Sequence, residues 1–552
     1  MRLRLAYWGV LLICVAPIIP GVLGIVSSAL GYIPALGLNS VGVEAFQQVW
    51  QWTGIERSLL LSLSSTLFST YLALAISFAI LASLWHSPYW RRVEHALSAL
   101  LALPHVAFAI GFAFLFAPTG MVSRLVHAMS GYQPSTQGAT WLVQDPYALG
   151  LTIALALKEV PFLLLMSLSV VQQLRIPSLL TVAASLGYSP RQAWFKLVLP
   201  QWLSKMRFAL FAVTSYGISV VDLSLILGPN TPPTFAVLVW QWFSDADLQQ
   251  IPRAAAGALL LLGLASIMLL SVLLIERILL GLCRQWMWSG RYALLLPGKS
   301  LLCLVCFISL SIFPLMMLWS IAQRWRFPEL WPSEYSWRFW LAEWPTMLPA
   351  LYQSVGLALV SGSLALLFAV LTHEYRQASP RSVPTYLIVM PMLVPALSLL
   401  FGVQILTLLI AGSNYVLWVI WGHLFFAFPL VYLALDGAWK SYPTDYHKIA
   451  ASLGKSDWSI FCRVKAPLLR PAMLYAWAIG ISVSLAQYLP TLMLGGGRFA
   501  TITTEAVTLS SGFDRRVMAI YALWQAVLPF IFFLLAIILS RAFQPQSLTR
   551  SC

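Results

Sequence analysis

The chain has 552 residues, of which 60% are hydrophobic and only 9% are charged, whereas ordinary soluble domains carry roughly 25% charged residues. A soluble chain of this length needs far more charged surface, and a disordered chain is much less apolar, so both classes are excluded. A net charge of +15 is typical of nucleic-acid binders, unless a membrane topology explains it. The composition predicts a polytopic membrane protein.

Twelve stretches reach the length of about 20 apolar residues that a membrane helix needs. In the first half they are Leu5–Leu30, Ser58–Trp85, Ala96–Ala117, Tyr147–Val171, Phe208–Gly228 and Ala254–Ile275. In the second half they are Leu301–Ile321, Ala350–Leu371, Tyr386–Ile410, Tyr415–Leu435, Pro471–Leu494 and Val517–Ser540. The first stretch follows Arg2 and Arg4, as a signal peptide would. It is long for a signal peptide and lacks a small-residue cleavage site, so we interpret it as an uncleaved span.

The basic residues are distributed unevenly between the two sides of this topology. With the N-terminus inside, 23 of the 33 Lys and Arg residues fall in inside segments, nine fall outside, and Lys158 lies within a span. Cytoplasmic loops of membrane proteins carry such an excess. We therefore expect a multi-pass membrane protein with both termini in the cytoplasm. The charge is then an orientation signal, and nucleic-acid binding is not expected.

The sequence offers no catalytic or metal-binding constellation. Cys303 and Cys306 form a CxxC pattern, but they lie in an apolar run and are interpreted as helix fillers. Gly298-Lys299-Ser300 resembles the end of a P-loop, but Ala293 stands where that loop requires glycine. His105 and His423 lie in spans, where we expect polar contacts between helices. The sequence predicts a subunit that is not an enzyme and holds no cofactor or metal.

Two long cytoplasmic loops, near residues 172–207 and 436–470, carry the same motif. The order Ala-Ala-Ser-Leu-Gly-x-Ser begins at Ala183 in one loop and at Ala450 in the other, an offset of 267 residues. A proline follows the motif glycine by 13 residues in both loops. Because the motif recurs in the corresponding loop of each half, it indicates an internal repeat.

The repeat divides the chain into two halves of six spans. We expect a first half at residues 1–282, a basic and aromatic cytoplasmic connector at 283–299, and a second half at 300–552. Halves with six spans each have the same orientation, so an axis along the membrane normal relates them. The expected fold is an all-α polytopic membrane protein with about twelve transmembrane helices in two parallel six-helix repeats.

The local sequence of each loop predicts two short helices that meet at a glycine. Gly187 and Gly454 suit the left-handed residue that ends a helix. Ser189 and Ser456 then suit the cap of a following helix. We expect these helices to be amphipathic, with Trp194, Phe195 and Leu197 in one copy and Trp458, Ile460 and Phe461 in the other, and their aromatic side chains to be exposed. Such a surface docks into a partner groove or anchors the loop at the membrane interface.

The repeated loop resembles the cytoplasmic signature loop of ABC importer permeases, which reads Glu-Ala-Ala-x-x-x-Gly, nine variable residues, then Ile-x-Leu-Pro. The matching positions are Ala183, Gly187, Leu199 and Pro200 in the first loop, and Ala450, Gly454 and Pro467 in the second. The stretches 221–234 and 486–498 strengthen the resemblance. It is greatest to fused two-half permeases of binding-protein-dependent systems of the thiamine and ferric-iron type, particularly a thiamine-like branch.

This resemblance implies a type I importer permease fold and a role for both loops as coupling helices. The expected partners are two copies of an ABC ATPase subunit, which hydrolyse the ATP, and a periplasmic binding protein. That protein delivers a small solute, which is thiamine-like, another cation, or iron. Thr181 and Lys448 replace the signature glutamate, and Lys465 and Ala466 depart from the pattern in the second loop. The usual contact of that acid with the ATPase is therefore missing twice.

A few polar residues suggest a translocation path. Asp222 lies within a span, where a charge costs about 2.5–3.5 kcal/mol and usually faces a water path or a bundle interior. The alternative is a structural acid that pairs with Lys158 or bonds to serine. Asn230, Arg498 and Glu505 are expected to line the outer mouth, with an ordinary periplasmic turn as the alternative for Asn230 and Arg498. The competing function is an ion-coupled secondary transporter with twelve spans.

Overall fold

The structure, a computed structural model, describes every residue except 1, 86, 89, 91, 92, 94–96, 98, 99, 132–141, 290, 291, 380, 410–413, 513 and 543–552. The expected span boundaries at Ala96 and Ile410 lie outside the described residues. So do four basic residues that were counted on the cytoplasmic side, namely Arg91, Arg92, Arg291 and Arg550.

The regular elements described in the first half are all helices, since an apolar run in a membrane satisfies its own backbone hydrogen bonds only as a helix. Its elements are α1 (Arg2–Cys14), α2 (Ile18–Ala29), η1 (Pro34–Leu36), α3 (Glu44–Trp50), α4 (Ile55–Leu84), α6 (His105–Phe116), α7 (Met121–Ser130), α8 (Leu149–Gln173), α9 (Ile176–Ser185), α10 (Pro190–Ala193), η2 (Trp194–Val198), α11 (Leu199–Lys205), α12 (Arg207–Ser219), α13 (Asp222–Leu227), α14 (Phe235–Phe243), η3 (Leu248–Gln250), α15 (Ile251–Leu282) and α16 (Arg284–Ser289).

The second half adds one small antiparallel hairpin to its helices. Its elements are α17 (Gly298–Ile321), β1 (Ala322–Arg324), β2 (Glu334–Tyr335), α18 (Arg338–Ala378), α19 (Thr385–Ile388), η4 (Met390–Met392), α20 (Ala396–Leu409), α21 (Tyr415–Ser441), α22 (Thr444–Ser452), α23 (Asp457–Ile460), η5 (Phe461–Lys465), α24 (Ala466–Ala486), α25 (Leu489–Gly495), α26 (Ile502–Ser510) and α27 (Arg515–Ala542).

Ten helical segments in the described part of the chain are long and apolar enough to cross a membrane. The all-α membrane fold is confirmed, but two of the twelve expected spans, Phe208–Gly228 and Tyr386–Ile410, have no counterpart among these ten segments. Phe208–Gly228 breaks at Val220, where the backbone becomes extended between α12 and α13. Tyr386–Ile410 breaks into α19, η4 and α20. Prolines at 391 and 395 explain the second break, because proline lacks the donor that a helix interior needs.

The two halves share a helix break at equivalent positions. Val220 lies between α12 and α13 with ψ 124°, and Gln487 lies between α24 and α25 with ψ 123°. The two residues are 267 positions apart, which is the offset of the loop motif. The repeat is therefore a repeat of backbone geometry as well as of sequence.

Each half receives the first helices of the other half. Helix α2 packs against α20, and α17 packs against α4 and α6. Glycines permit both close crossings: a Cβ added to Gly402 in α20 would lie 1.7 Å from the Gly21 carbonyl oxygen of α2, and one added to Gly111 in α6 would lie 2.0 Å from Ile312 of α17. The exchange ties the halves together over the length of the bundle.

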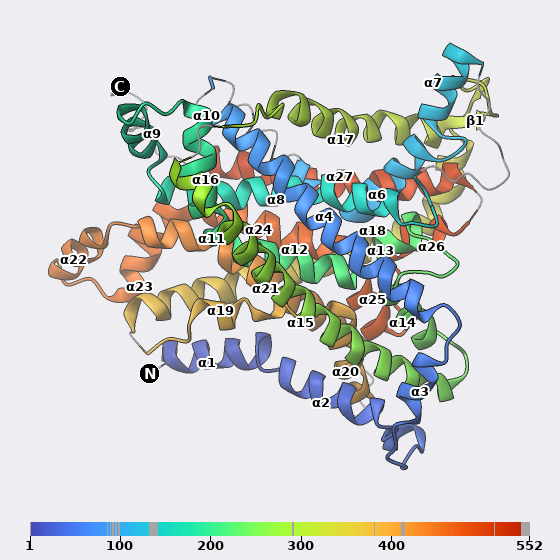
Figure 1. Ribbon diagram of the computed structural model, residues 1–552. Coiled ribbons are helices and arrows are strands. Elements are labelled where there is room, and N and C mark those ends of the chain that lie inside the picture. Colours follow the sequence, from blue (N-terminus) through green and yellow to red (C-terminus); the bar gives the residue numbers. More distant parts are fainter. Residues whose placement is uncertain are drawn as a thin grey trace.

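The short helices of the two repeated loops lie at one end of the molecule, which we call the loop end (α9, α10, α22 and α23). Helix α1 also begins near this end, on the left of Figure 1. The opposite end carries α7, β1, α14 and α26, and we call it the hairpin end. The two repeated loops and the β1–β2 hairpin therefore lie at opposite ends of the helical bundle.

Candidate functional site

Both loops bend at a left-handed glycine in the same way. Gly187 has φ +77° and Gly454 has φ +73°. The residue after each glycine donates its N–H to the first alanine of the motif: Tyr188 to the Ala183 carbonyl at 3.0 Å, and Lys455 to the Ala450 carbonyl at 3.3 Å. This is the 6→1 bond of a Schellman cap, which ends a helix where an L side chain would be strained. The predicted glycine bend is confirmed in both copies.

A serine cap then starts the second short helix of each loop. Ser189 Oγ accepts from the Gln192 N–H at 3.4 Å, and the Gln192 side chain accepts from the Ser189 N–H at 2.8 Å. Ser456 Oγ accepts from the Ser459 N–H at 3.4 Å. Each short helix continues through a π-helical turn, η2 or η5, into a helix that carries the motif proline as its second residue. Proline is well placed there, because the first turn needs no N–H.

The aromatic side chains of the first loop are not exposed, contrary to expectation. Trp194 is 3% exposed and lies against Phe78 of α4, with ring centroids 6.2 Å apart. In the second loop Ile460 is buried, whereas Trp458 is 75% exposed. The helical turn after the cap runs back towards the bundle, so its apolar side chains pack inward. The first loop therefore presents other residues to a partner.

An equivalent pair of exposed apolar residues lies before the glycine in each loop. Val182 and Leu186 are 58% and 64% exposed, and their equivalents at offset 267, Ile449 and Leu453, are 59% and 70% exposed. Residues four apart share one helix face, so each loop presents the same pair of apolar side chains. Sequence reasoning missed these pairs. Each loop has two apolar residues four positions apart just before the glycine, and the recurrence of this spacing would have indicated the pairs.

The predicted loop residues occupy distinct environments. Ala183 is buried and Ala450 is half-buried, so they form the inner side of the bend. Leu199 and Pro200 are half-buried, and Pro467 is exposed. Gly187 and Gly454 are exposed, and a Cβ at either position would meet nothing within 4 Å. Their requirement for glycine therefore comes from the backbone conformation and not from space.

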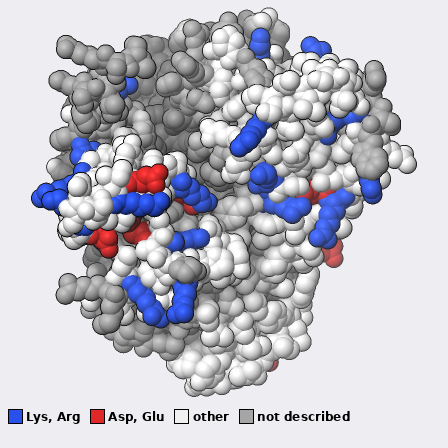
Figure 2. Space-filling model, turned by 90° about the vertical axis from the view of Figure 1, so that its left-hand side faces the viewer, with Lys and Arg blue, Asp and Glu red and all other residues white. Residues whose placement is uncertain are grey.

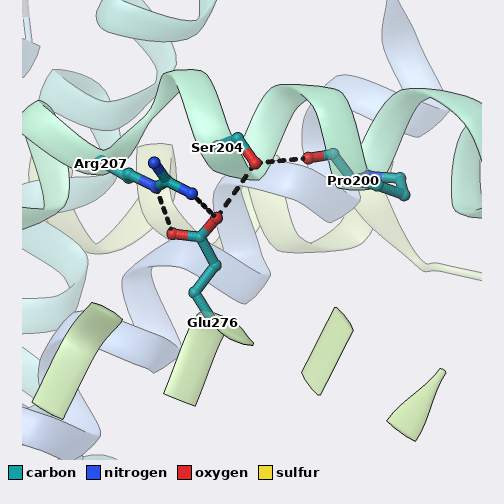
Figure 3. A network of polar contacts seen from close by, with 4 residues as sticks. All are labelled: Pro200, Ser204, Arg207 and Glu276. Carbon is teal, nitrogen blue, oxygen red and sulfur yellow. Dashed lines mark hydrogen bonds and ion pairs between the residues drawn. The ribbon is translucent and has the colours of Figure 1, made fainter. Parts of the chain in front are cut away.

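An ion pair anchors the first loop to α15. Arg207 donates from Nε to Glu276 Oε2 at 2.7 Å and from Nη2 to Oε1 at 2.9 Å (Figure 3). Ser204 donates to Glu276 Oε1 at 3.0 Å and to the carbonyl of Pro200 at 3.1 Å. The Glu276 side chain is only 3% exposed. Such a bidentate pair fixes both the distance and the orientation of the two helices.

A different ion pair anchors the second loop to α18. Lys465 Nζ lies 2.5 Å from Glu374 Oε1, which also accepts from Trp439 Nε1 at 2.8 Å. The lysine lies over the ring of Tyr442 at 5.1 Å. Burial and the Glu374 carboxylate raise the pKa of the Tyr442 hydroxyl, which keeps it protonated. The lysine that departs from the family pattern is thus the anchor of this loop.

The expected path residues lie apart from the loops. Asp222 begins α13 and is half-buried. Within the described residues no ion pair joins it to Lys158, which instead donates to the Leu100 carbonyl at 3.2 Å. Glu159 lies 3.6 Å from His105, and the His105 ring lies 4.9 Å from that of Tyr216. The first half therefore holds a polar group in which Glu159 is buried and His105, Tyr216 and Asp222 are half-buried.

The residues expected at the outer mouth lie on several elements. Asn230 is exposed, and Glu505 is half-buried in α26, which packs against α13. Arg498 is exposed and lies 3.9 Å from the centroid of the Tyr415 ring. No hydrogen bond or ion pair joins these residues to Asp222 within the described part of the chain.

His423 makes the interhelical polar contacts that its position in a span predicts. Its two ring nitrogens lie 2.7 Å from Ser484 Oγ and 2.8 Å from Thr491 Oγ1. These contacts join α21 to α24 and α25. The histidine is 1% exposed, so it has a structural position in the second half.

The loop end is rich in basic side chains. Figure 2 shows this end, where Lys and Arg side chains gather and Asp and Glu side chains are few. The first loop contributes Arg175, Arg191, Lys196, Lys205 and Arg207 and no acidic residue. The second loop contributes both signs of charge, including ion pairs of Lys440 with Asp436 and of Lys448 with Asp445.

Known proteins resemble the chain over most of its length. The family of binding-protein-dependent transport system inner membrane components matches residues 363–547. The inner membrane ABC transporter permease protein YnjC of Escherichia coli is 34% identical over 97% of this chain and 96% of its own length. The thiamine transport system permease protein ThiP of Salmonella typhimurium is 28% identical over 46% of this chain and 48% of its own length.

Proposed function

The chain belongs to the ABC transporter permeases of the inner membrane, and on this premise we propose that its two loops couple solute passage to two copies of an ATPase subunit. The observation that carries the proposal is the repeated pair of exposed apolar residues, Val182 with Leu186 and Ile449 with Leu453, on helices that end in the same glycine bend. An amphipathic helix with such a pair suits a hydrophobic groove. Two equivalent helices at one end suit two copies of one partner.

The coupling would proceed through the anchors of the loops. Each docked helix, α9 or α22, is followed after the glycine bend by a short helix whose π-helical turn leads back to the bundle, and an ion pair anchors each loop to a neighbouring helix. When ATP binding draws the two partner subunits together, the loops approach each other and the two halves rock around a shared path. This chain supplies the translocation path and the coupling helices, and its partner subunits hydrolyse ATP.

The proposed organisation keeps the sequence-derived boundaries. Residues 1–282 form the first permease half, 283–299 form the connector, and 300–552 form the second half. Both termini and the loop end face the cytoplasm, in agreement with the excess of basic residues there. The hairpin end then faces the periplasm and receives the binding protein.

The solute is proposed to be a small cation, thiamine-like or another, or iron. The support is the pair of carboxylates Asp222 and Glu159 near His105, and the similarity to a thiamine transport permease. Asn230, Arg498 and Glu505 are proposed to line the outer mouth. Family membership removes the alternative of an ion-coupled secondary transporter.

The docking role is tested by removing the glycine bends. The variant Gly187→Val with Gly454→Val forces an L side chain into a left-handed conformation, which distorts both loops. We expect ATPase recovered with the tagged permease to fall about tenfold or more. Gly281→Val is the matched control, because Gly281 is exposed near the loop end, has helical backbone and has nothing near its Cβ. Equal recovery from both variants would contradict the docking role.

A further inference from the structure

A cavity of about 240 Å³ at the hairpin end gathers three arginines, and no part of the proposed coupling uses it. Three separate segments build it: the turn from α6 into α7, the end of α17 with the β1–β2 hairpin, and the start of α27. Figure 1 shows α7 and β1 side by side at this end. The lining side chains that matter are Arg124, Arg515, Arg516, Trp319, Trp325 and Asp514.

Arg124 is the deepest of these cations, and its partners are neutral. The residue is 2% exposed. Its Nε donates to the Thr119 carbonyl at 3.1 Å, and its Nη1 donates to the Arg326 carbonyl at 2.9 Å and to the carbonyl of Glu329. Its guanidinium lies 4.7 Å from the centroid of the Trp325 ring. These contacts satisfy hydrogen bonds, but within the described residues no carboxylate lies at ion-pair distance from the guanidinium, and the Glu329 carboxylate acts on it only from farther away.

The other two arginines are held in the same manner. Arg515 donates to Thr119 Oγ1 at 2.8 Å and lies 5.2 Å from the centroid of the Trp319 ring. Arg516 donates to two carbonyls at the start of β1, at 2.9 and 2.8 Å. Within the described residues, the one carboxylate at ion-pair distance from any of the three is Asp514, 3.8 Å from Arg516.

The charge of the lining is therefore unbalanced. Three guanidinium groups and one carboxylate give +3 − 1 = +2. Arg124 is buried, and Arg515 and Arg516 are half-buried. Charges withdrawn from water are normally paired, because desolvation of a fully buried ion costs several kcal/mol that carbonyl contacts repay only in part. If the arginines served only to hold the hairpin, neutral donors would do so at a lower desolvation cost. The arrangement instead suits a dianion that completes the pairing.

We propose that this cavity binds a phosphate group, supplied either by a phospholipid headgroup or by a free phosphate compound. A phosphate dianion matches the +2 lining, whereas a single carboxylate would leave it half-compensated. Guanidinium groups bind phosphate oxygens in a bidentate fashion, and the cavity is smaller than those that hold drug-sized ligands. The bound group joins segments of both permease halves at the hairpin end.

The test measures thermal unfolding of the purified full-length chain with two probes. One probe is inorganic phosphate in detergent, compared with chloride at equal ionic strength. The other is a nanodisc of phosphatidylcholine that contains phosphatidate, compared with phosphatidylcholine alone. Stabilisation by phosphate identifies a free phosphate compound as a source, and stabilisation by phosphatidate alone identifies a lipid headgroup. Absence of both stabilisations overturns the proposal.

Three variants assign the effect to the cavity. Arg515→Gln should weaken phosphate or phosphatidate binding about tenfold or more, whereas Arg338→Gln, an exposed arginine outside the cavity, should leave it unchanged. Asp514→Asn removes the one carboxylate of the lining and should strengthen binding about threefold. This gain keeps the proposal testable if Arg515→Gln fails to fold. Equal binding by Arg515→Gln and Arg338→Gln, or weaker binding by Asp514→Asn, would overturn it.

Discussion

The two loops share a backbone, a sequence motif and an exposed apolar pair, but they differ in charge and in the ion pairs that anchor them. Glycine bend, serine cap and π-helical turn recur at an offset of 267 residues. The first loop is basic and anchored to α15 by Arg207 and Glu276, whereas the second carries both charges and is anchored to α18 by Lys465 and Glu374. Arg191 of the first loop corresponds to the exposed Trp458 of the second.

The features that the two loops share suit docking, whereas the features in which they differ suit the packing of each loop against its own half. The bend and the exposed apolar pair occur in both copies, so they are the features that two identical partners would recognise. The anchors differ because the loops meet different helices of the bundle. We therefore expect changes in the shared features to affect association, and changes in the anchors to affect stability of one half at a time.

The largest expected effect comes from charging both apolar pairs. Leu186→Glu with Leu453→Glu places two carboxylates where an apolar groove would close over them, and each single variant affects one site. We expect the double variant to lose ATPase binding about 100-fold, which is about 2.7 kcal/mol. Leu248→Glu, an exposed leucine before α15, is the control. Co-purification across ATPase concentrations measures the binding. Equal binding by the control and the double variant would contradict the shared docking face.

The anchors should differ in how much stability they contribute. Arg207→Met leaves Glu276 buried with Ser204 as its hydrogen-bond partner in the described part of the chain, so we expect a loss of about 2–3 kcal/mol after allowance for the half-exposed arginine. Lys465→Met leaves Glu374 a quarter exposed and still bonded to Trp439, and should cost about 1 kcal/mol.

Thermal unfolding in detergent compares the two anchor variants. Adding Glu276→Leu to Arg207→Met should recover most of the loss, because the unpaired buried charge is then gone. A larger loss for Lys465→Met than for Arg207→Met would reverse the ranking and contradict the account of the anchors.

The smallest effect should come from the position at which the loop surfaces differ. Trp458→Arg gives the second loop the residue of the first, and removes an exposed aromatic ring from the docking surface. We expect about a threefold loss of ATPase affinity, or less than 1 kcal/mol. Surface plasmon resonance with the purified ATPase measures this change. A loss as large as that of the charged double variant would place the main contact at Trp458.

Local signals account for what the sequence could predict. Apolar runs predicted most of the spans. The glycine and serine of each loop predicted the bend and the cap, because neighbouring residues determine these features. The burial of Trp194 beneath Phe78 could not be predicted, since it depends on which helix lies opposite. The break at Val220 became recognisable only beside its counterpart Gln487.

The ion pairs were beyond sequence reasoning for the same reason. Glu276 follows Arg207 by 69 residues, and Lys465 follows Glu374 by 91, with no periodicity to link them. Lys465 departs from the family's loop pattern, and only the structure shows that it pairs with the carboxylate of Glu374. The surroundings of the candidate path residue Asp222 were the least predictable part, because they depend on which helices face each other. Its alternative partner Lys158 donates to the Leu100 carbonyl.

Photocrosslinking from the two equivalent leucines tests the central claim most directly. A benzophenone amino acid replaces Leu186, Leu453 or both in the full-length permease that is co-expressed with its ATPase, and a P-loop peptide identifies the captured subunit by mass spectrometry. We expect one ATPase attached at either single position, two attached to the double variant, and none at Leu248. A double variant that captures a single ATPase, or capture at Leu248 alone, would contradict the claim that each loop docks its own subunit.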